Sequence, residues 1–234
     1  MTATAAEQEY LESLFWLYEA QLPMTGANLA RAMQLSAPTV SEMLNRLQRD
    51  GYIERGGGRG ISFTDAGRTH AEQIVSRHRM IERFLTDVVG VPWDEVHEEA
   101  EKLEFAMTPR FEAYIRSAVG DAKTCPHGHP IRVGERIDGV PLADCAVGAK
   151  VTILRLENEA EDLLHYLKAA GVEPGMTGEI AANDGEQVTV RFDDSMADVT
   201  FSVAETVSVL ADPSPPPRTA LPEQLVLGTQ RYGR

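Results

Sequence analysis

Apolar residues recur at helical spacing from about residue 10 and predict a first helix that stops at Pro23. Thr25 and Ser36 are suited to cap two further helices, the second with Pro38 in its first turn. Alternating residues at 52–55 and 61–64, on either side of a glycine-rich turn, predict a β-hairpin. Three helices followed by a hairpin is the order of a winged helix-turn-helix, and we interpret residues 1–72 as a DNA-binding domain. The alternative is a generic small α/β domain.

Residues 73–140 read as helices. A long amphipathic helix runs through His78 to Leu85 and is broken at Gly90, and a second begins at Trp93 or Asp94. Thr108-Pro109 interrupts the second helix, and a short third helix follows. Their apolar faces suit a dimer interface, so we interpret this part as a helical metal-binding and dimerisation domain. The alternative is that these faces only cover the first domain.

Residues 141–211 change character, because short alternating segments predict strands at 151–155, 178–180, 187–191 and 198–201. A helix over 160–170 separates the first two strands. This pattern predicts a small SH3-like β-barrel. Residues 212–234 are proline-rich, and we expect a flexible tail. The predicted fold class is therefore α+β: a winged helix-turn-helix, a helical dimerisation domain and a C-terminal SH3-like barrel.

The net charge of −14 argues against nucleic-acid binding, because phosphates repel an acidic surface. The distribution softens this objection, since arginines gather in the first third of the chain. These arginines are Arg31, Arg46, Arg49, Arg55, Arg59 and Arg68.

No apolar run is long enough to span a bilayer, and no secretory signal is visible, so we expect a cytoplasmic protein without a membrane partner. Cys125 and Cys145 are expected to be free thiols in a reducing compartment.

Candidate metal ligands lie at helical spacing in two of the predicted helices. His78 and Glu82 are four residues apart, and His97 is followed by Glu101 and Glu104 at spacings of four and three, so each set shares a helix face. Hard oxygen donors with imidazole, and no thiolate, suit manganese or iron(II) better than copper or zinc. The alternative is an ordinary solvated helix face. Glu9 and Glu12 stand three apart in the first helix.

The segment Cys125–Pro130 is a second place where zinc-type ligands occur. Ligands one residue apart in a proline-broken loop do not easily close a tetrahedron. We therefore interpret it as a structural loop, with metal binding as the lesser alternative.

Several of these motifs, in order, resemble the diphtheria toxin repressor and manganese transport regulator family of metal-dependent repressors. Residues 77–85 look like one signature, and residues 96–104 look like a second. The loop 125–131, the recognition-helix start 36–41 and the wing end 63–67 are also similar. The resemblance covers roughly residues 7–210. It implies a winged helix, dimerisation helices and an SH3-like (FeoA-like) barrel, with two metal positions per subunit.

The resemblance also implies roles for individual residues. His78, Glu82 and His97 match ancillary-site ligands, and Glu159 and Asp162 match the contribution of the barrel to that site. The primary-site ligands that it implies are Glu9, Glu101 and Glu104.

The likeness also bears on which metal is sensed. Manganese-type members have glutamate at the position of Glu101, where iron-type members have cysteine, so Mn²⁺ is expected, with Fe²⁺ as the alternative. Phe105 stands where the family usually has a histidine ligand, and a phenyl ring cannot bind a metal. More distant alternatives are a metal-independent winged-helix regulator and a di-metal carboxylate enzyme. The second needs Glu-x-x-His motifs that are not well placed here, so we expect a regulator and no enzyme.

The expected partner is double-stranded operator DNA, bound by a homodimer with two recognition helices in successive major grooves. The exposed start of the recognition helix offers groups for phosphates, bases and a thymine methyl. Arg46, Arg31 and Arg59 are candidate phosphate contacts. The candidate residues at the helix start are Ser36, Pro38, Thr39, Ser41 and Glu42.

A bound cation is expected to draw mutually repelling carboxylates together and hold the two DNA-binding domains of the dimer in register.

Overall fold

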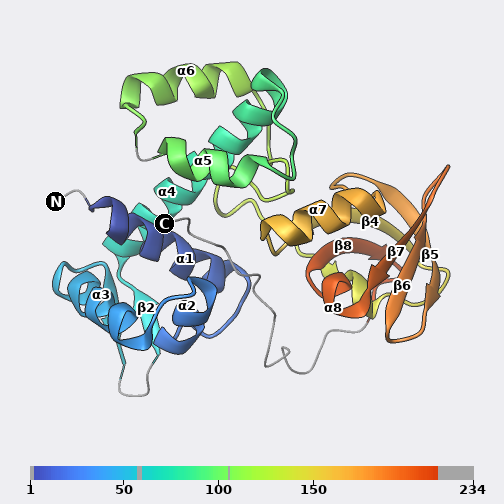
Figure 1. Cartoon of the computed structure of the whole chain (residues 1–234), viewed down its shortest axis with the longest axis horizontal. Coiled ribbons are helices and arrows are strands. Elements are labelled where there is room, and N and C mark those ends of the chain that lie inside the picture. The colour runs from blue at the N-terminus through green and yellow to red at the C-terminus, as the bar shows by residue number, and fades with distance from the viewer. Residues whose placement is uncertain (1–2, 57–59, 105, 216–234) are drawn as a thin grey trace.

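The computed structural model describes residues 3–56, 60–104 and 106–215. Figure 1 shows the secondary structure gathered in three bodies along the chain. Each body has its own cluster of buried apolar side chains. The predicted α+β fold, with an N-terminal helical body, a second helical body and a C-terminal antiparallel sheet, is confirmed. No helix among the described residues is both long and apolar enough to cross a membrane.

The first body is the predicted winged helix. Its helices are α1 (Ala5–Glu19), α2 (Gly26–Ala32) and α3 (Ala37–Arg49), and its hairpin is β1 (Ile53–Arg55) paired antiparallel with β2 (Ile61–Phe63). Thr25 and Ser36 cap α2 and α3 as expected, because their hydroxyls accept backbone N–H bonds three residues on. α1 ends at Glu19, before Pro23, since Gln21 adopts a φ of 57° and the Leu22 N–H bonds back to Leu17.

The second body consists of α4 (Asp65–Phe84), a π-helical segment η1 (Leu85–Val89), α5 (Val96–Glu104) and α6 (Pro109–Val119). α5 begins later than expected, because residues 93–95 form a turn closed by the Glu95 N–H on the Pro92 carbonyl. α4 joins the first two bodies. Ala71 and Ile74 lie in the winged-helix core, whereas Met80 lies in the core of the second body. One helix therefore connects the winged helix to the helices that carry the candidate ligands.

The third body is a six-stranded antiparallel sheet in the order β3-β8-β4-β5-β6-β7, with α7 following β4 (Figure 1). Its core strands include the four that the sequence predicted, together with β3 and β8, which it did not. The proposed tail boundary falls at Asp212, the last residue of β8, and residues 216–234 lie outside the described part. The elements are β3 (Val140–Pro141), η2 (Leu142–Asp144), β4 (Lys150–Leu156), α7 (Glu161–Ala170), β5 (Thr177–Asn183), β6 (Gln187–Arg191), β7 (Met196–Thr200), α8 (Phe201–Ala204) and β8 (Val207–Asp212).

The loop around residues 123–131 lies against both helices and barrel. Gly128 has a φ of +91°, and a Cβ there would lie 1.9 Å from the Leu154 carbonyl oxygen in β4, so only glycine allows this approach. On the other side, the Arg83 guanidinium of α4 donates to the carbonyls of Thr124 and Cys125, both at 2.8 Å. These contacts fix where the loop presents its side chains.

Candidate metal centre

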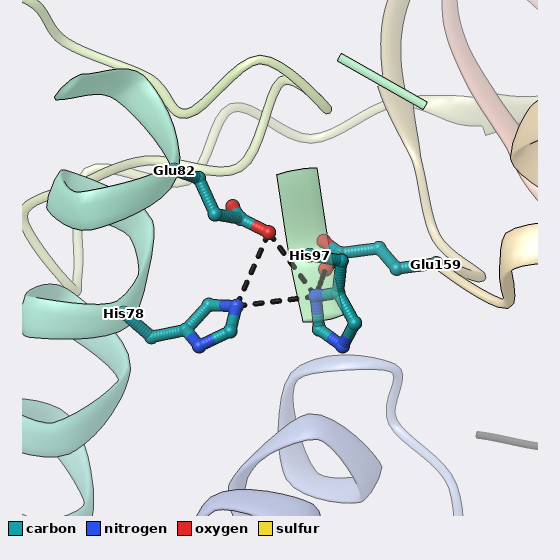
Figure 2. A group of neighbouring side chains, drawn as sticks. All are labelled: His78, Glu82, His97 and Glu159. Carbon is teal, nitrogen blue, oxygen red and sulfur yellow. Dashed lines mark hydrogen bonds and ion pairs between the residues drawn. The ribbon is translucent and has the colours of Figure 1, made fainter. Parts of the chain in front are cut away.

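Four donor side chains meet where α4, α5 and the barrel come together. His78 and Glu82 lie one turn apart on α4, His97 comes from the start of α5, and Glu159 from the segment before α7. Figure 2 shows the four side chains pointing toward one another. One donor atom from each lies within 4.8 Å of all the others. We call these four residues the inner group.

The contacts within the inner group centre on two atoms. Glu82 Oε1 is 3.1 Å from both His78 Nε2 and His97 Nδ1, and these two nitrogens are also 3.1 Å apart (Figure 2). His97 Nδ1 is 3.0 Å from Glu159 Oε2. Glu82 is completely buried. Glu82, at the middle of the group, is therefore removed from bulk water, and the donor atoms of the group converge on a small volume.

The loop before the barrel adds two donors that the sequence interpretation kept only as the lesser alternative. His127 Nδ1 lies 3.3 Å from Glu82 Oε1 and 3.7 Å from Glu159 Oε2, and Cys125 belongs to the same set of mutually close donor atoms. His127 Nε2 is 2.8 Å from the Trp93 carbonyl oxygen, which only accepts, so this nitrogen carries the proton. In the neutral ring the Nδ1 lone pair then faces the carboxylates. The loop therefore places an imidazole and a thiol beside the carboxylates of the inner group.

A second set of carboxylates lies on the other side of His78. Glu9 and Glu12 come from α1, and Glu101 and Glu104 from α5; we call these four the outer group. Glu104 Oε2 is 3.0 Å and Glu12 Oε1 3.6 Å from His78 Nδ1. Burial and the charges of Glu101 and Glu104 raise the pKa of Glu9. Burial and Glu104 raise the pKa of Glu12 well above its usual range.

The electrostatics of the inner group show what holds it together without a cation. Burial disfavours a carboxylate, but the imidazoles of His127 and His78 hold the pKa of Glu82 well below its usual range. Burial likewise disfavours an imidazolium, yet Glu82 and Glu12 raise the pKa of His78 well above normal. Burial and Glu82 also oppose the Glu159 charge, but His127 and His97 lower its pKa to about 2. Protons on the imidazoles therefore take the place that a cation would fill.

Unpartnered lone pairs test whether these residues fit a metal ion. Glu82 Oε2, Glu12 Oε1, Glu104 Oε1 and His127 Nδ1 are buried and make no hydrogen bond. Such groups are costly to bury, and all four are atoms that bind a cation when deprotonated. Imidazole and carboxylate donors suit divalent transition metals. The donor set therefore fits a divalent cation.

One expected ligand, Asp162, stands apart from the others. Asp162 is exposed in the first turn of α7, where one of its oxygens accepts the Leu163 N–H, and it belongs to no set of close donors among the described residues. It lines an acidic cleft that reaches Glu101 and Glu159. Phe105 lies outside the described residues.

Five of the predicted DNA-contacting residues lie at the start of α3. The Ser36 hydroxyl caps the helix by accepting the Thr39 N–H at 3.3 Å. Arg46, a predicted phosphate contact, has its Nε 2.7 Å from Glu7 Oε1 in α1, and its side chain is 41% exposed. Arg59 falls outside the described residues. The exposed residues at the start of α3 are Ser36, Pro38, Thr39, Ser41 and Glu42.

Comparisons with known proteins give the context of this arrangement. A model described as the iron-dependent repressor N-terminal DNA-binding domain matches residues 2–61. A second, for the metal-binding and dimerisation domain of the same repressors, matches residues 64–132, and a FeoA domain model matches residues 140–211. The iron-dependent repressor IdeR of Mycobacterium tuberculosis is 32% identical over 197 residues, which are 77% of this chain and 86% of that relative. This chain belongs to the iron-dependent repressor family.

The names of the matching proteins do not agree on one metal. The diphtheria toxin repressor of Corynebacterium diphtheriae is 28% identical, over 86% of this chain and 94% of that protein. A solved structure described as a manganese-dependent transcriptional repressor in complex with manganese matches with a TM-score of 0.78 and 28% identity, over 88% of this chain and 99% of its own. Iron and manganese both occur among these names, so family membership leaves the metal of this chain open.

Proposed function

We propose that this protein is a manganese-responsive repressor that binds operator DNA as a homodimer and controls genes of metal-ion homeostasis or transport. It acts as a regulator and not as an enzyme. The observation that carries the proposal is the convergence of buried donor atoms without hydrogen-bond partners from α1, α4, α5 and the loop before the barrel. An operator-binding protein works where the chromosome is, so we place it in the cytoplasm.

The donor types favour manganese. The outer group offers carboxylates alone, and Glu101 stands where a thiolate would favour a softer ion. Iron(II) is the second candidate, and one observation favours it: the Cys125 sulfur lies beside Glu82 and His127. Burial raises the pKa of this thiol to about 11, so it binds a metal only if the ion displaces its proton.

In this proposal the ligands are His78, Glu82, His97 and Glu159 for one position, with His127 and Cys125 beside it. The second position is held by Glu9, Glu12, Glu101 and Glu104, and Asp162 remains a candidate only if the start of α7 moves. A bound divalent cation supplies the positive charge that these carboxylates lack.

α1 is the element through which the centre acts on the DNA-reading part. Without a cation, like charges of Glu9, Glu12 and Glu104 repel by on the order of 1 to 4 kcal/mol per close pair. With the charge balanced, Glu9 and Glu12 hold α1 against α5, and the winged helix attached to α1 is confined to fewer orientations. The DNA-competent arrangement then gains population by differential binding.

Exposed apolar side chains support a dimer of the second body. They lie on η1, α5 and α6, and Tyr114 is 58% and Phe111 47% exposed. Burying such a surface in a homodimer would place two α3 helices for two half-sites of an operator. Ser36, Pro38, Thr39, Ser41 and Glu42 would then face the groove, with Arg46 and Arg59 as phosphate contacts. The apolar residues are Val88, Val89, Leu103, Phe111 and Tyr114.

The test is DNA binding measured by fluorescence anisotropy on fragments that carry promoters of metal-transport genes. We expect specific binding in Mn²⁺ that is lost in chelator, and weaker binding at equal free Fe²⁺ under anaerobic conditions. Equal or tighter binding with Fe²⁺ would favour the second candidate. Binding that chelator leaves unchanged would contradict metal dependence altogether.

A further inference from the structure

An acidic cleft lies where the beginning of α5 faces the beginning of α7. Its volume is about 220 Å³. Seven carboxylate side chains line it, and no arginine or lysine is among the described residues that do so. Two members of the inner group, His97 and Glu159, are also part of its wall. The cleft therefore brings a concentrated negative charge up to the buried donors.

The side chains that line the cleft become less exposed toward the inner group. Glu98 is 45% exposed, Glu101 19% and His97 7%. The cleft thus runs from solvent to the inner group. The carboxylate of Asp94 is balanced by the Lys168 ammonium, with which it forms an ion pair. We call the four remaining carboxylates at the outer end the rim: Glu95, Glu98, Glu161 and Asp162.

Acidic surfaces are common without a bound ion, but this cleft leads to donor atoms that have no partner. Glu82 Oε2 and His127 Nδ1 make no hydrogen bond, and both side chains are completely buried. The Oε2 of Glu159, in the wall of the cleft, is 3.7 Å from His127 Nδ1. Glu82 and Glu159 belong to the same set of close donor atoms. A cation that passes Glu159 therefore reaches ligands at once.

We propose that this cleft is the route by which a divalent cation enters the inner group, and that the rim carboxylates collect the ion and speed its entry. The inference rests on the proposed function, because it takes the inner group as a cation position. Clefts lined by one sign of charge concentrate ions of the opposite sign and raise association rates by about 10- to 1,000-fold. Asp162 contributes to this from the rim without any movement of α7.

The volume of the cleft suits a hydrated ion. A divalent ion with about six bound waters occupies roughly 180 Å³, at about 30 Å³ per water. A cleft of about 220 Å³ holds this without stripping the waters at the surface. The donors at the inner end then replace the waters, where their own charge and geometry compensate for the loss.

Two other cavities approach the inner group, and both suit a cation less well. One borders Glu159 but has a volume of only about 50 Å³ and includes the guanidinium of Arg136 in its wall. The other lies beside Cys125 and has a volume of about 400 Å³. Arg83 lines it, and Glu173 is the single carboxylate among the described residues around it. Only the acidic cleft combines sufficient size with a favourable charge.

The experiment measures how fast Mn²⁺ enters full-length protein, by stopped-flow quenching of tryptophan fluorescence. Both tryptophans of the chain report on the inner group. The Trp16 ring centroid is 5.6 Å from that of His97, and the Trp93 centroid is 6.2 Å from that of His127. A paramagnetic ion among these imidazoles quenches both indoles.

Glu98→Lys reverses one rim charge. Glu99→Lys is the matched control, because Glu99 is the next residue on α5, also forms an ion pair with Lys102, and does not line the cleft. Glu173→Lys places the same charge in the rival cavity. Glu95→Lys, in the turn before α5, repeats the test at the rim if Glu98→Lys does not fold.

We expect Mn²⁺ to associate about tenfold more slowly with Glu98→Lys than with the wild type at 0.1 M salt, and at nearly the wild-type rate with the other two variants. The ion leaves by the same route, so dissociation also slows, and Kd changes less than the association rate. At 1 M salt, where the Debye length is about 3 Å, the difference should largely vanish.

Three results would overturn the proposal. Equal slowing in Glu98→Lys and Glu99→Lys would mean that the net charge of the protein, and not the cleft, attracts the ion. Slowing in Glu173→Lys alone would assign entry to the cavity beside Cys125. An unchanged association rate with a higher Kd in Glu98→Lys would make Glu98 a contact of the bound ion. The proposed function fails separately, if Mn²⁺ at any concentration leaves the wild-type fluorescence unchanged.

Discussion

Replacing Glu82 by glutamine tests the centre most severely, because the change keeps the shape and removes the charge. Glu82 is completely buried, and its Oε1 is 3.1 Å from nitrogens of His78 and His97 and 3.3 Å from His127. Without a cation, the variant leaves protonated imidazoles without their shared counter-charge. Breaking a buried ion pair in this way costs about 3–5 kcal/mol. For a chain of this length 1 kcal/mol shifts the Tm by about 2–4 °C, so we expect a fall on the order of 6–20 °C in chelator.

The same variant should also respond less to manganese. A ligand at a hundred times its Kd stabilises the folded state by about 2.7 kcal/mol, which raises the wild-type Tm by about 5–11 °C. Glu82→Gln should show a small fraction of this rise at the same Mn²⁺ concentration, and the exposed Glu161→Gln control the whole of it. The assay is thermal denaturation followed by circular dichroism, in chelator and in Mn²⁺. A Mn²⁺-induced rise in Glu82→Gln equal to that of the wild type would refute the assignment of Glu82 as a ligand.

Four further outcomes follow from the structure. Carboxylates raise the pKa of His78 well above its usual value despite its burial, so its contribution to metal-free stability is complete below the unfolded pKa and is lost as pH rises through the folded one. Because Mn²⁺ competes with that proton, the Mn²⁺-induced rise in Tm should grow as the pH increases from the unfolded pKa through the folded one. Gly128→Ala would place a Cβ 1.9 Å from the Leu154 carbonyl, and should cost about 1–3 kcal/mol in denaturant titration and weaken Mn²⁺ binding. Arg79→Met leaves the nearly buried Glu19 of α1 without its ion-pair partner and should lower the unfolding free energy by about 3–5 kcal/mol, partly recovered in the double variant with Glu19→Gln. Tyr114→Asp on exposed α6 should shift the dimer toward monomer in sedimentation velocity.

Each of these has a result that would contradict it. A pH-independent Mn²⁺ effect would exclude competition with imidazole protons. Wild-type stability of Gly128→Ala would mean that the loop does not need its close approach to β4. No recovery in the Arg79 and Glu19 double variant would mean that the two side chains act independently. An unchanged sedimentation coefficient for Tyr114→Asp would place the dimer contact elsewhere.

The helical parts of the centre were predictable because their spacing is local. His78 and Glu82 on one helix, and His97 and Glu101 on another, share a face through the period of the α-helix alone. The caps at Thr25 and Ser36 are local in the same sense, which is why the winged helix could be predicted from its own sequence.

The contributions that the sequence did not reveal depend on contacts between distant segments. His127 contacts Glu82 although the two are 45 positions apart in the sequence, and only because Gly128 lets the loop approach β4. Arg46 looks like a free cation in sequence, but Glu7 from α1 lies beside it in the fold. β8 escaped prediction because Val207, Ser208 and Val209 are all buried, which removes the alternation that marks a strand with one solvent face.

The most direct measurement is a crystal of the protein grown in Mn²⁺ and recorded at a wavelength where manganese scatters anomalously. The account predicts one anomalous peak among His78 Nε2, Glu82, His97 Nδ1 and Glu159, and a second beside Glu12 and Glu104. Anomalous maps without a peak at either place, from crystals of protein that binds its DNA in Mn²⁺, would contradict it.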